Sequence, residues 1–162
     1  MTNVEPIRLG IIGIGRAGWG MHCAELKGRE DKFRIVAACD VLEDRRAKMQ
    51  ETYACATYAN VEDLIADPNV EMVDIASRSV DHFRHAKMAL EAGKMVNLEK
   101  PMTVNYAEAK ALQELSVSTG VPLFIRHNRR FEPGYQHIRE IMASGILGEV
   151  YEIKLRRVSY QR

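Results

Sequence analysis

Short apolar runs recur along the chain, and segments with helical periodicity separate them. The first run, Ile7–Ile12, is apolar at 7, 9, 11 and 12, as expected of a buried strand. Since strands alternate with helices, we predict an α/β fold, a Rossmann-type doubly wound parallel sheet with right-handed crossovers. Strands are predicted at 7–12, 33–39, 57–58, 72–77, 94–98 and 123–127, and helices at 19–27, 43–53, 61–66, 81–92, 106–119 and 133–144.

Local signals mark helix ends and helix faces. Asn60 and Asn105, each followed three residues later by an acid, have the spacing of N-terminal caps. In the helix predicted over 133–144, Ile138, Ile141 and Met142 share one face. We expect that face to point into a core.

The C-terminal segment has a different pattern. Apolar and charged residues alternate in Tyr151–Arg156, which is typical of a strand with one solvent-facing side. No partner strand follows it, so we interpret Val150–Val158 as the first strand of a second α/β domain that the chain truncates. We therefore predict an NAD(P)-binding Rossmann domain over 1–126. Residues 127–162 would form a junction and the first elements of a C-terminal substrate domain.

A glycine-rich turn follows the first apolar run directly. It comprises Gly13, Ile14, Gly15, Arg16, Ala17 and Gly18 in the pattern G-x-G-x-x-G. In a dinucleotide fold the first glycine permits a sharp turn and the second lets the backbone approach a pyrophosphate. The third lets the next helix press on the strand, and that helix points free N–H groups at the phosphates. Three glycines also fit an ordinary tight turn, so the surrounding sequence has to decide.

An acidic residue provides that context. The second apolar strand ends in Asp40, at about the 20-residue spacing where a carboxylate holds a ribose hydroxyl. A carboxylate there accepts hydrogen bonds from ribose and repels a 2′-phosphate, so we predict NAD rather than NADP. Arg45 and Arg46 lie nearby and could instead receive that phosphate.

Composition narrows the class of protein. The 162 residues fit one full domain, and the net charge of +1 indicates neither a nucleic-acid-binding surface nor a polybasic membrane surface. We see no signal peptide and no apolar run of about 20 residues. The chain has three cysteines, Cys23, Cys39 and Cys55, which is an odd number, and they are widely spaced. They indicate free thiols in a reducing compartment, and hence a cytoplasmic protein.

Side chains at the carboxyl ends of the predicted strands are the candidates for chemistry, because ligands of doubly wound sheets bind there. Lys100, in Glu99-Lys100-Pro101, can hydrogen-bond a reacting hydroxyl or carbonyl oxygen and stabilise negative charge during hydride transfer. The alternative is an ordinary surface lysine.

Two histidines and two arginines lie at the same edge. His82 is a candidate for contact with cofactor or substrate, or else a loop histidine with a local hydrogen bond. His82 and His85 are spaced i, i+3, but no neighbouring ligand completes a metal set, so we expect no metal site. Arg129 and Arg130 could meet an anionic or polyol group, or form a solvated pair at a domain junction.

Taken together, these segments resemble a known family. Over nearly its whole length the chain is similar to the N-terminal half of the glucose–fructose oxidoreductase / inositol dehydrogenase (Gfo/Idh/MocA) family. The segments that carry the resemblance are G-I-G-R-A-G followed by His22, V-A-A-C-D, A-L-E-A-G-K-M-V-N-L-E-K-P, R-R-F-E-P and S-G-I-L-G-E-V. The E-K-P segment is far more specific than the glycine turn.

The resemblance implies a first domain that binds NAD or NADP and a catalytic set that includes Lys100. It implies hydride transfer between a sugar or polyol carbinol and nicotinamide. Ser77, Arg78, His82 and Glu99 are expected near the cofactor because their loops lie at the carboxyl ends of the predicted strands. A second domain would build most of the substrate site and supply an aspartate–histidine pair. The loop after the fourth strand departs from the family: it is usually proline-rich, as in A-T-P, whereas this chain has A-S-R-S.

Other functions stay open. The chain could be a non-catalytic NAD-binding module or a partner subunit, which detectable turnover would exclude. A methyltransferase that uses S-adenosylmethionine also has a glycine-rich first loop, although E-K-P argues against it. For the oxidoreductase we expect a small-molecule sugar or polyol substrate, a homo-oligomer, no nucleic-acid or membrane partner, and an incomplete enzyme in this chain alone.

Overall fold

The computed structural model describes residues 5–156 and 158, and it divides into two compact units, Met1–Arg126 and His127–Arg162. The division falls where the domain boundary was predicted, and the assignment of a cofactor and a substrate domain to the two sides stays a prediction. Each unit is described by itself below.

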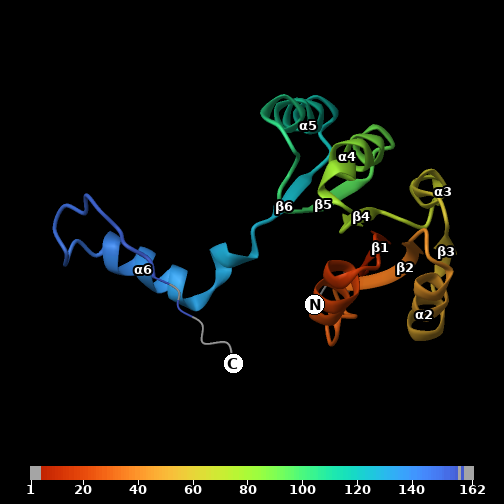
Figure 1. The fold of residues 1–162 in the computed structure, drawn as a ribbon, viewed down its shortest axis with the longest axis horizontal. Coiled ribbons are helices and arrows are strands. Elements are labelled where there is room, and N and C mark those ends of the chain that lie inside the picture. Colours follow the sequence, from red (N-terminus) through yellow and green to blue (C-terminus); the bar gives the residue numbers. More distant parts are fainter. Residues whose placement is uncertain (1–4, 157, 159–162) are drawn as a thin grey trace. The chain divides into compact units, whose positions relative to one another are not determined.

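The first unit is built on a six-stranded sheet (Figure 1). Every neighbouring pair of strands is parallel, and the strand order is β3-β2-β1-β4-β5-β6. The order reverses between β1 and β4, which confirms the predicted doubly wound topology. The strands are β1 (Ile7–Ile12), β2 (Phe33–Cys39), β3 (Ala56–Tyr58), β4 (Met72–Ile75), β5 (Met95–Glu99) and β6 (Leu123–Arg126).

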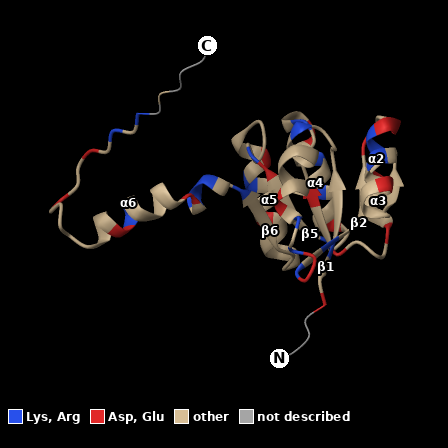
Figure 2. Ribbon diagram, turned by 90° about the horizontal axis from the view of Figure 1, so that it is seen from below, with Lys and Arg blue, Asp and Glu red and all other residues tan. Residues whose placement is uncertain are grey.

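Helices cover both faces of this sheet, because successive strand residues point to opposite sides. Ile12 packs in a core with α3 (Val61–Ala66), α4 (His82–Glu91) and α5 (Tyr106–Thr119). Ile11 packs on the other side with Cys23 and with Met49 of α2 (Glu43–Tyr53). Met49 is the only buried residue of α2, and the rest of this helix includes both acidic and basic residues, the red and blue segments of its ribbon in Figure 2.

The predicted helix caps form in one case and change in the other. The Asn105 carboxamide oxygen accepts the backbone N–H of Glu108 at 2.9 Å, so α5 begins with the predicted cap. Asn60 also lies at the N-cap of α3, but its side chain donates to the Asp63 carboxylate instead of accepting from the backbone.

The first crossover helix is not a regular α-helix. Residues 19–27 were predicted as one helix, whereas Gly18–Cys23 form a π-helix, η1, followed by the short α1 (Ala24–Leu26). A Cβ atom on Gly18 would lie 2.0 Å from the carbonyl oxygen of Gly13. The helix therefore presses on the preceding turn as closely as glycine allows. π-Helical turns are rare and occur frequently at functional sites.

The second unit contains η3 (Asn128–Phe131) and α6 (Pro133–Ala143). Arg129 and Arg130 lie in η3, and Arg129 pairs with Glu132. The expectation that Ile138, Ile141 and Met142 point into a core is wrong for this chain, because α6 has no buried residue.

The predicted C-terminal strand is also absent. Residues 150–156 and 158 have no strand hydrogen bonding, and residue 157 lies outside the described part of the chain. An alternating pattern needs a neighbouring strand to satisfy its backbone N–H and C=O groups. The described part of the second unit supplies no such neighbour.

Candidate functional site

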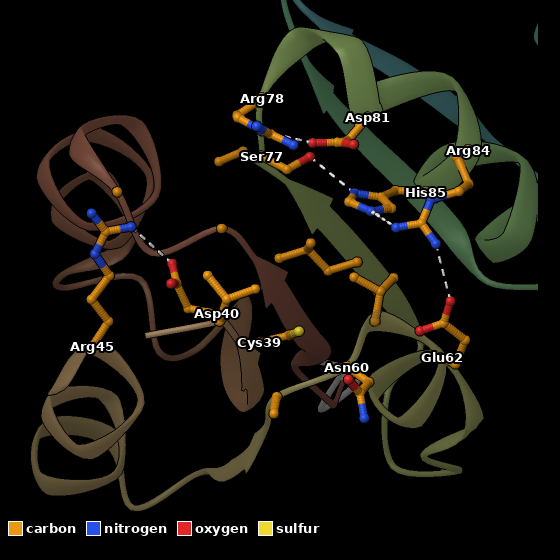
Figure 3. Close-up of a pocket in the computed structure, with 17 residues that line it drawn as sticks. Cys39, Asp40, Arg45, Asn60, Glu62, Ser77, Arg78, Asp81, Arg84 and His85 are labelled. Atoms are coloured by element: carbon orange, nitrogen blue, oxygen red, sulfur yellow. Dashed lines mark hydrogen bonds and ion pairs between the residues drawn. The ribbon is translucent and has the colours of Figure 1, made fainter. Parts of the chain in front are cut away.

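A cavity of about 650 Å³ opens at the carboxyl ends of β1, β2 and β4, next to the point where the strand order reverses (Figure 3). Its volume lies within the range of about 300–1,000 Å³ that is usual for small-molecule sites. Six of the predicted site residues line it, namely Gly13, Gly15, Asp40, Arg45, Ser77 and Arg78. Segments far apart in the sequence therefore converge at the edge predicted from the fold.

The three glycines of the turn have separate roles. Gly13 has φ +88°, and a Cβ there would lie 2.7 Å from the backbone nitrogen of Ser77, so glycine is needed for both the turn and the close packing. A Cβ on Gly15 would meet only the Arg45 guanidinium, at 3.7 Å. The backbone of Gly15 is therefore open to the cavity, which fits the close approach of a pyrophosphate.

Asp40 is buried and holds the turn in place. One carboxylate oxygen, Oδ2, accepts the backbone N–H of Ile14 at 2.8 Å and the Arg45 guanidinium at 3.1 Å. The other oxygen, Oδ1, accepts the backbone N–H of Leu42 at 3.0 Å. A carboxylate offers about four lone-pair positions, so acceptor capacity remains on Oδ1 for a ligand hydroxyl.

The remaining residues of the turn lie outside the lining of the cavity. The side chain of Ile14 is buried in the core, Arg16 is exposed, Ala17 is partly buried and Gly18 packs under the turn. Their predicted contacts with a cofactor stay predictions.

A chain of polar contacts crosses the far wall of the cavity, where Ser77, His85, Arg84 and Glu62 follow one another (Figure 3). Ser77 Oγ lies 3.0 Å from His85 Nδ1, and His85 Nε2 lies 3.1 Å from Arg84 Nη2. Arg84 Nη1 donates to Glu62 at 3.1 Å. Burial, and then the charge of Arg84, lowers the pKa of His85. Sequence reasoning did not connect these residues.

His82 is fully buried and lies outside the cavity lining. Its Nδ1 atom is 2.8 Å from the carbonyl oxygen of Pro101, and its Nε2 atom is 3.1 Å from the carbonyl oxygen of Ser77. His82 therefore joins the loop after β4 to the loop after β5. Its predicted contact with a cofactor or substrate stays a prediction.

Lys100 follows β5 and is 57% exposed at its side chain. Its ammonium lies 3.6 Å from Oε2 of Glu99, and its backbone N–H donates to the same oxygen at 2.8 Å. Glu99 is buried, and burial alone would raise its pKa. Hydrogen bonds from His22 and Arg126, with the charge of Lys100, outweigh burial and lower the pKa of Glu99. An ionised Glu99 thus lies directly beside the candidate catalytic lysine.

A buried polar network behind Glu99 escaped the sequence analysis. His22 Nδ1 lies 2.6 Å from Asp74, and His22 Nε2 lies 3.3 Å from Glu99. Asn97 donates to Asp74 at 2.6 Å, and Arg126 donates to Glu99 at 3.0 Å. Burial opposes the charge on His22, but the hydrogen bond and charge of Asp74 outweigh it, so the pKa of His22 is raised.

A signal for this network was present in the strands. Central parallel strands are usually apolar on both faces, yet β4 contains Asp74, and β5 alternates between apolar and polar residues from Val96 to Glu99. Asp74, Asn97 and Glu99 lie on one side of the sheet. Asp74 and Asn97 are direct neighbours in the sheet, as are Glu99 and Arg126. That alternation indicates a polar face covered by another element, here η1 with its His22.

The cysteines and histidines form no metal site among residues 5–156 and 158, since no group of three or more possible ligands is arranged to hold an ion. Cys23, Cys39 and Cys55 are free and buried, and burial raises the pKa of Cys23 and Cys39 to about 11. Within the same described residues, no helix has the length and apolarity to cross a membrane.

Comparison with known proteins places this geometry in a family. Residues 7–127 match the model of the Gfo/Idh/MocA oxidoreductase family, described as an NAD-binding Rossmann fold. The chain belongs to this family. The resemblance of the glycine turn and the E-K-P segment is thereby confirmed, and the cavity described above lies within the family's NAD-binding domain.

Members of the Gfo/Idh/MocA family align with almost the whole chain. An uncharacterized oxidoreductase of Schizosaccharomyces pombe is 35% identical, with 93% of this chain and 42% of the relative covered. Myo-inositol 2-dehydrogenase of Thermotoga maritima is 32% identical, with 92% and 44% covered. The crystal structure of myo-inositol 2-dehydrogenase from Lactobacillus plantarum superimposes with a TM-score of 0.83 at 25% identity, over 90% of this chain and 43% of that one. The chain thus spans less than half the length of these relatives.

Proposed function

We propose that the chain forms the cofactor-binding half of a Gfo/Idh/MocA oxidoreductase that transfers hydride between a carbinol carbon of a sugar or polyol and nicotinamide. The observation that carries the proposal is the cavity at the switch point of the sheet, where Gly13, Gly15 and Asp40 meet. Two myo-inositol 2-dehydrogenases among the similar proteins support the substrate class.

The residues of the cavity fit a dinucleotide. Gly15 presents bare backbone where a pyrophosphate would approach, and the remaining acceptor position of Asp40 would take a ribose hydroxyl. Bound nicotinamide supplies the hydride-accepting carbon. Lys100 would hydrogen-bond the reacting oxygen, and Glu99 holds the backbone and ammonium of Lys100 from behind.

The proposed cofactor is NAD rather than NADP. Asp40 is buried and negatively charged at the position of the ribose, so a 2′-phosphate there would meet its repulsion. Arg45 opposes this effect, because it contacts Asp40 and lines the same cavity. We therefore expect a moderate preference. A cytoplasmic location, consistent with three free cysteines, and a homo-oligomeric state belong to the proposal as well.

The second candidate is a non-catalytic NAD-binding module or partner subunit. The observation that favours it is that Lys100, the candidate catalytic residue, lies outside the cavity lining and is 57% exposed at its side chain. Both candidates require the cavity to bind NADH, and they differ in turnover.

Cofactor binding can be measured through Trp19, the single tryptophan, which follows Gly18 directly. We expect NADH to quench Trp19 emission saturably and to show emission sensitised by energy transfer, with S-adenosylmethionine unable to displace it. A chain that is folded by circular dichroism but shows no saturable NADH signal would contradict the proposal. Because this half alone is expected to be inactive, turnover is measured on a longer protein that contains this chain. Formation of NADH from NAD and a polyol panel that includes myo-inositol then separates the enzyme from the non-catalytic module.

A further inference from the structure

The protonation of one buried histidine follows from its two neighbours. A guanidinium group carries only N–H donors, so the His85 Nε2 atom 3.1 Å from Arg84 Nη2 must be the unprotonated acceptor. Neutral imidazole then carries its proton on Nδ1, which donates to Ser77 Oγ at 3.0 Å. The lowered pKa of His85 agrees with a neutral ring.

The consequence falls on the hydroxyl of Ser77. Because Ser77 Oγ already accepts a hydrogen bond from His85, its own hydrogen is free to donate elsewhere. Ser77 lines the cavity, and Arg84 is held in place from the other side by Glu62 at 3.1 Å. The hydrogen bonds are therefore donated in one direction: Arg84 donates to His85, and His85 donates to Ser77.

We propose that Arg84 and His85 are positioning residues that fix Ser77 as a hydrogen-bond donor to an acceptor oxygen of the bound dinucleotide. The ligand in this statement rests on the proposed function, whereas the relay from Arg84 to Ser77 is a property of the free chain. Without Arg84 the ring can carry its proton on Nε2. His85 Nδ1 then accepts the Ser77 hydrogen, and the cavity faces only lone pairs of Ser77, which disfavour an oxygen without a hydrogen of its own, such as a phosphate oxygen.

The relay can be tested without any ligand. Long-range ¹H–¹⁵N correlation spectra at pH 8 report which imidazole nitrogen is protonated, and His85→Gln assigns the His85 signals among the five histidines. We expect protonated Nδ1 and bare Nε2 in the unsubstituted chain, and a shift toward protonated Nε2 in Arg84→Met. Protonated Nε2 in the unsubstituted chain would overturn the relay.

A matched control removes the same charge elsewhere on the cavity wall. Arg78 also lines the cavity but pairs with Asp81 rather than with His85. Arg78→Met should therefore leave the tautomer of His85 unchanged, even where the loss of positive charge weakens NADH binding. A tautomer shift in Arg78→Met as large as that in Arg84→Met would show that the general field, and not the contact with Arg84, sets the proton position, and it would overturn the relay.

A double-mutant cycle on NADH affinity tests the role of the relay in binding. Ser77→Ala and Arg84→Met should each weaken NADH binding by roughly 2- to 12-fold, the value of one hydrogen bond. In the Ser77→Ala background, Arg84→Met should add less than about twofold, because both changes remove the same interaction. Arg78→Met should instead cost the same in both backgrounds.

The outcomes separate the two proposals. If Arg84→Met weakens binding equally with and without Ser77, Arg84 acts on the ligand by its charge, and the proposed role is wrong. Normal NADH affinity in a correctly folded Ser77→Ala chain would also overturn it. A chain with the expected tautomer that fails to bind NADH at all would contradict the proposed function while the relay stands. Thermal melting of each variant establishes that it is folded.

Discussion

The Nδ1 atom of His22 lies 2.6 Å from Oδ2 of Asp74, and both residues are buried. The pair connects the π-helix η1 to the central strand β4. Through its other nitrogen His22 reaches Glu99, which contacts Lys100. The charge state of one buried imidazole is therefore linked to the position of the candidate catalytic residue.

The first prediction concerns the pH dependence of stability. The pKa of His22 is raised in the folded chain, so its contribution to stability is complete below the unfolded-state pKa of about 6.5 and is lost as pH rises through the folded-state pKa. Removing one partner of a buried ion pair costs about 3–5 kcal/mol. We expect His22→Gln to lower the free energy of unfolding by an amount of this order at pH 6, and by progressively less toward pH 9.

Urea denaturation at several pH values measures this difference, in which the contributions of titratable groups that do not contact His22 cancel. His137→Gln is the matched control, because His137 is exposed on α6 and should cost little at any pH. A penalty for His22→Gln that does not change between pH 6 and pH 9 would show that His22 stabilises the fold by packing and not by charge.

The second prediction separates two glycines of one motif. A Cβ on Gly15 meets only the Arg45 guanidinium, at a van der Waals distance of 3.7 Å, whereas a Cβ on Gly18 collides with the Gly13 carbonyl. Gly15→Ala should leave the free energy of unfolding within about 0.5 kcal/mol and weaken NADH binding at least about tenfold. Gly18→Ala should destabilise the chain by about 1–3 kcal/mol or more. Urea melts and Trp19 titrations check both, and unimpaired NADH binding by Gly15→Ala would contradict the assigned position of the pyrophosphate.

The third prediction concerns cofactor preference. Asp40→Ser removes the charge that repels a 2′-phosphate and releases Arg45 from its ion pair. NADPH should then bind as tightly as NADH or more tightly, and the gain should disappear in Asp40→Ser/Arg45→Gln. The unsubstituted chain should prefer NADH in parallel titrations. Equal affinities for the two cofactors before any substitution would show that Asp40 does not face the 2′ position.

The fourth prediction concerns Lys100 in a protein that contains this chain and shows dehydrogenase turnover. Lys100→Ala should lower kcat by about 10²–10⁴-fold, the usual loss of an acid–base group. NADH affinity should change little, because Lys100 lies outside the cavity lined by Gly15 and Asp40. Steady-state kinetics beside a Trp19 titration measures both quantities. Normal turnover by Lys100→Ala would identify an ordinary surface lysine.

Much of the first unit could be predicted because its signals are local. The bounds of β2 and α2 agree with the predicted 33–39 and 43–53, where runs of apolar or charged residues meet clear turns. The cavity residues were also foreseeable, since parallel strands end at one edge and Gly15 and Asp40 each follow a strand there.

The errors arise where structure depends on distant partners. His22 meets Asp74 across 52 residues and Glu99 across 77, and no local pattern joins these positions. The relay from Arg84 to Ser77 depends on how α4 is rotated about its axis relative to the loop that contains Ser77. The alternation in Tyr151–Arg156 is a real strand pattern, but a strand forms only against a neighbour, which the described residues of its unit do not provide.

The π-helical turn over Gly18–Cys23 also fixes the number of residues between Gly18 and His22. Gly20 within it has no atoms close to where a Cβ would stand, so many side chains fit there. Removing that residue is different, because each residue of a helix rotates the chain by a large part of a turn, about 100° in an α-helix and less in the wider π-helix. With one residue fewer, His22 could not face Asp74 while Gly18 stays against Gly13. This segment therefore accepts substitutions of side chain but not single-residue insertions or deletions.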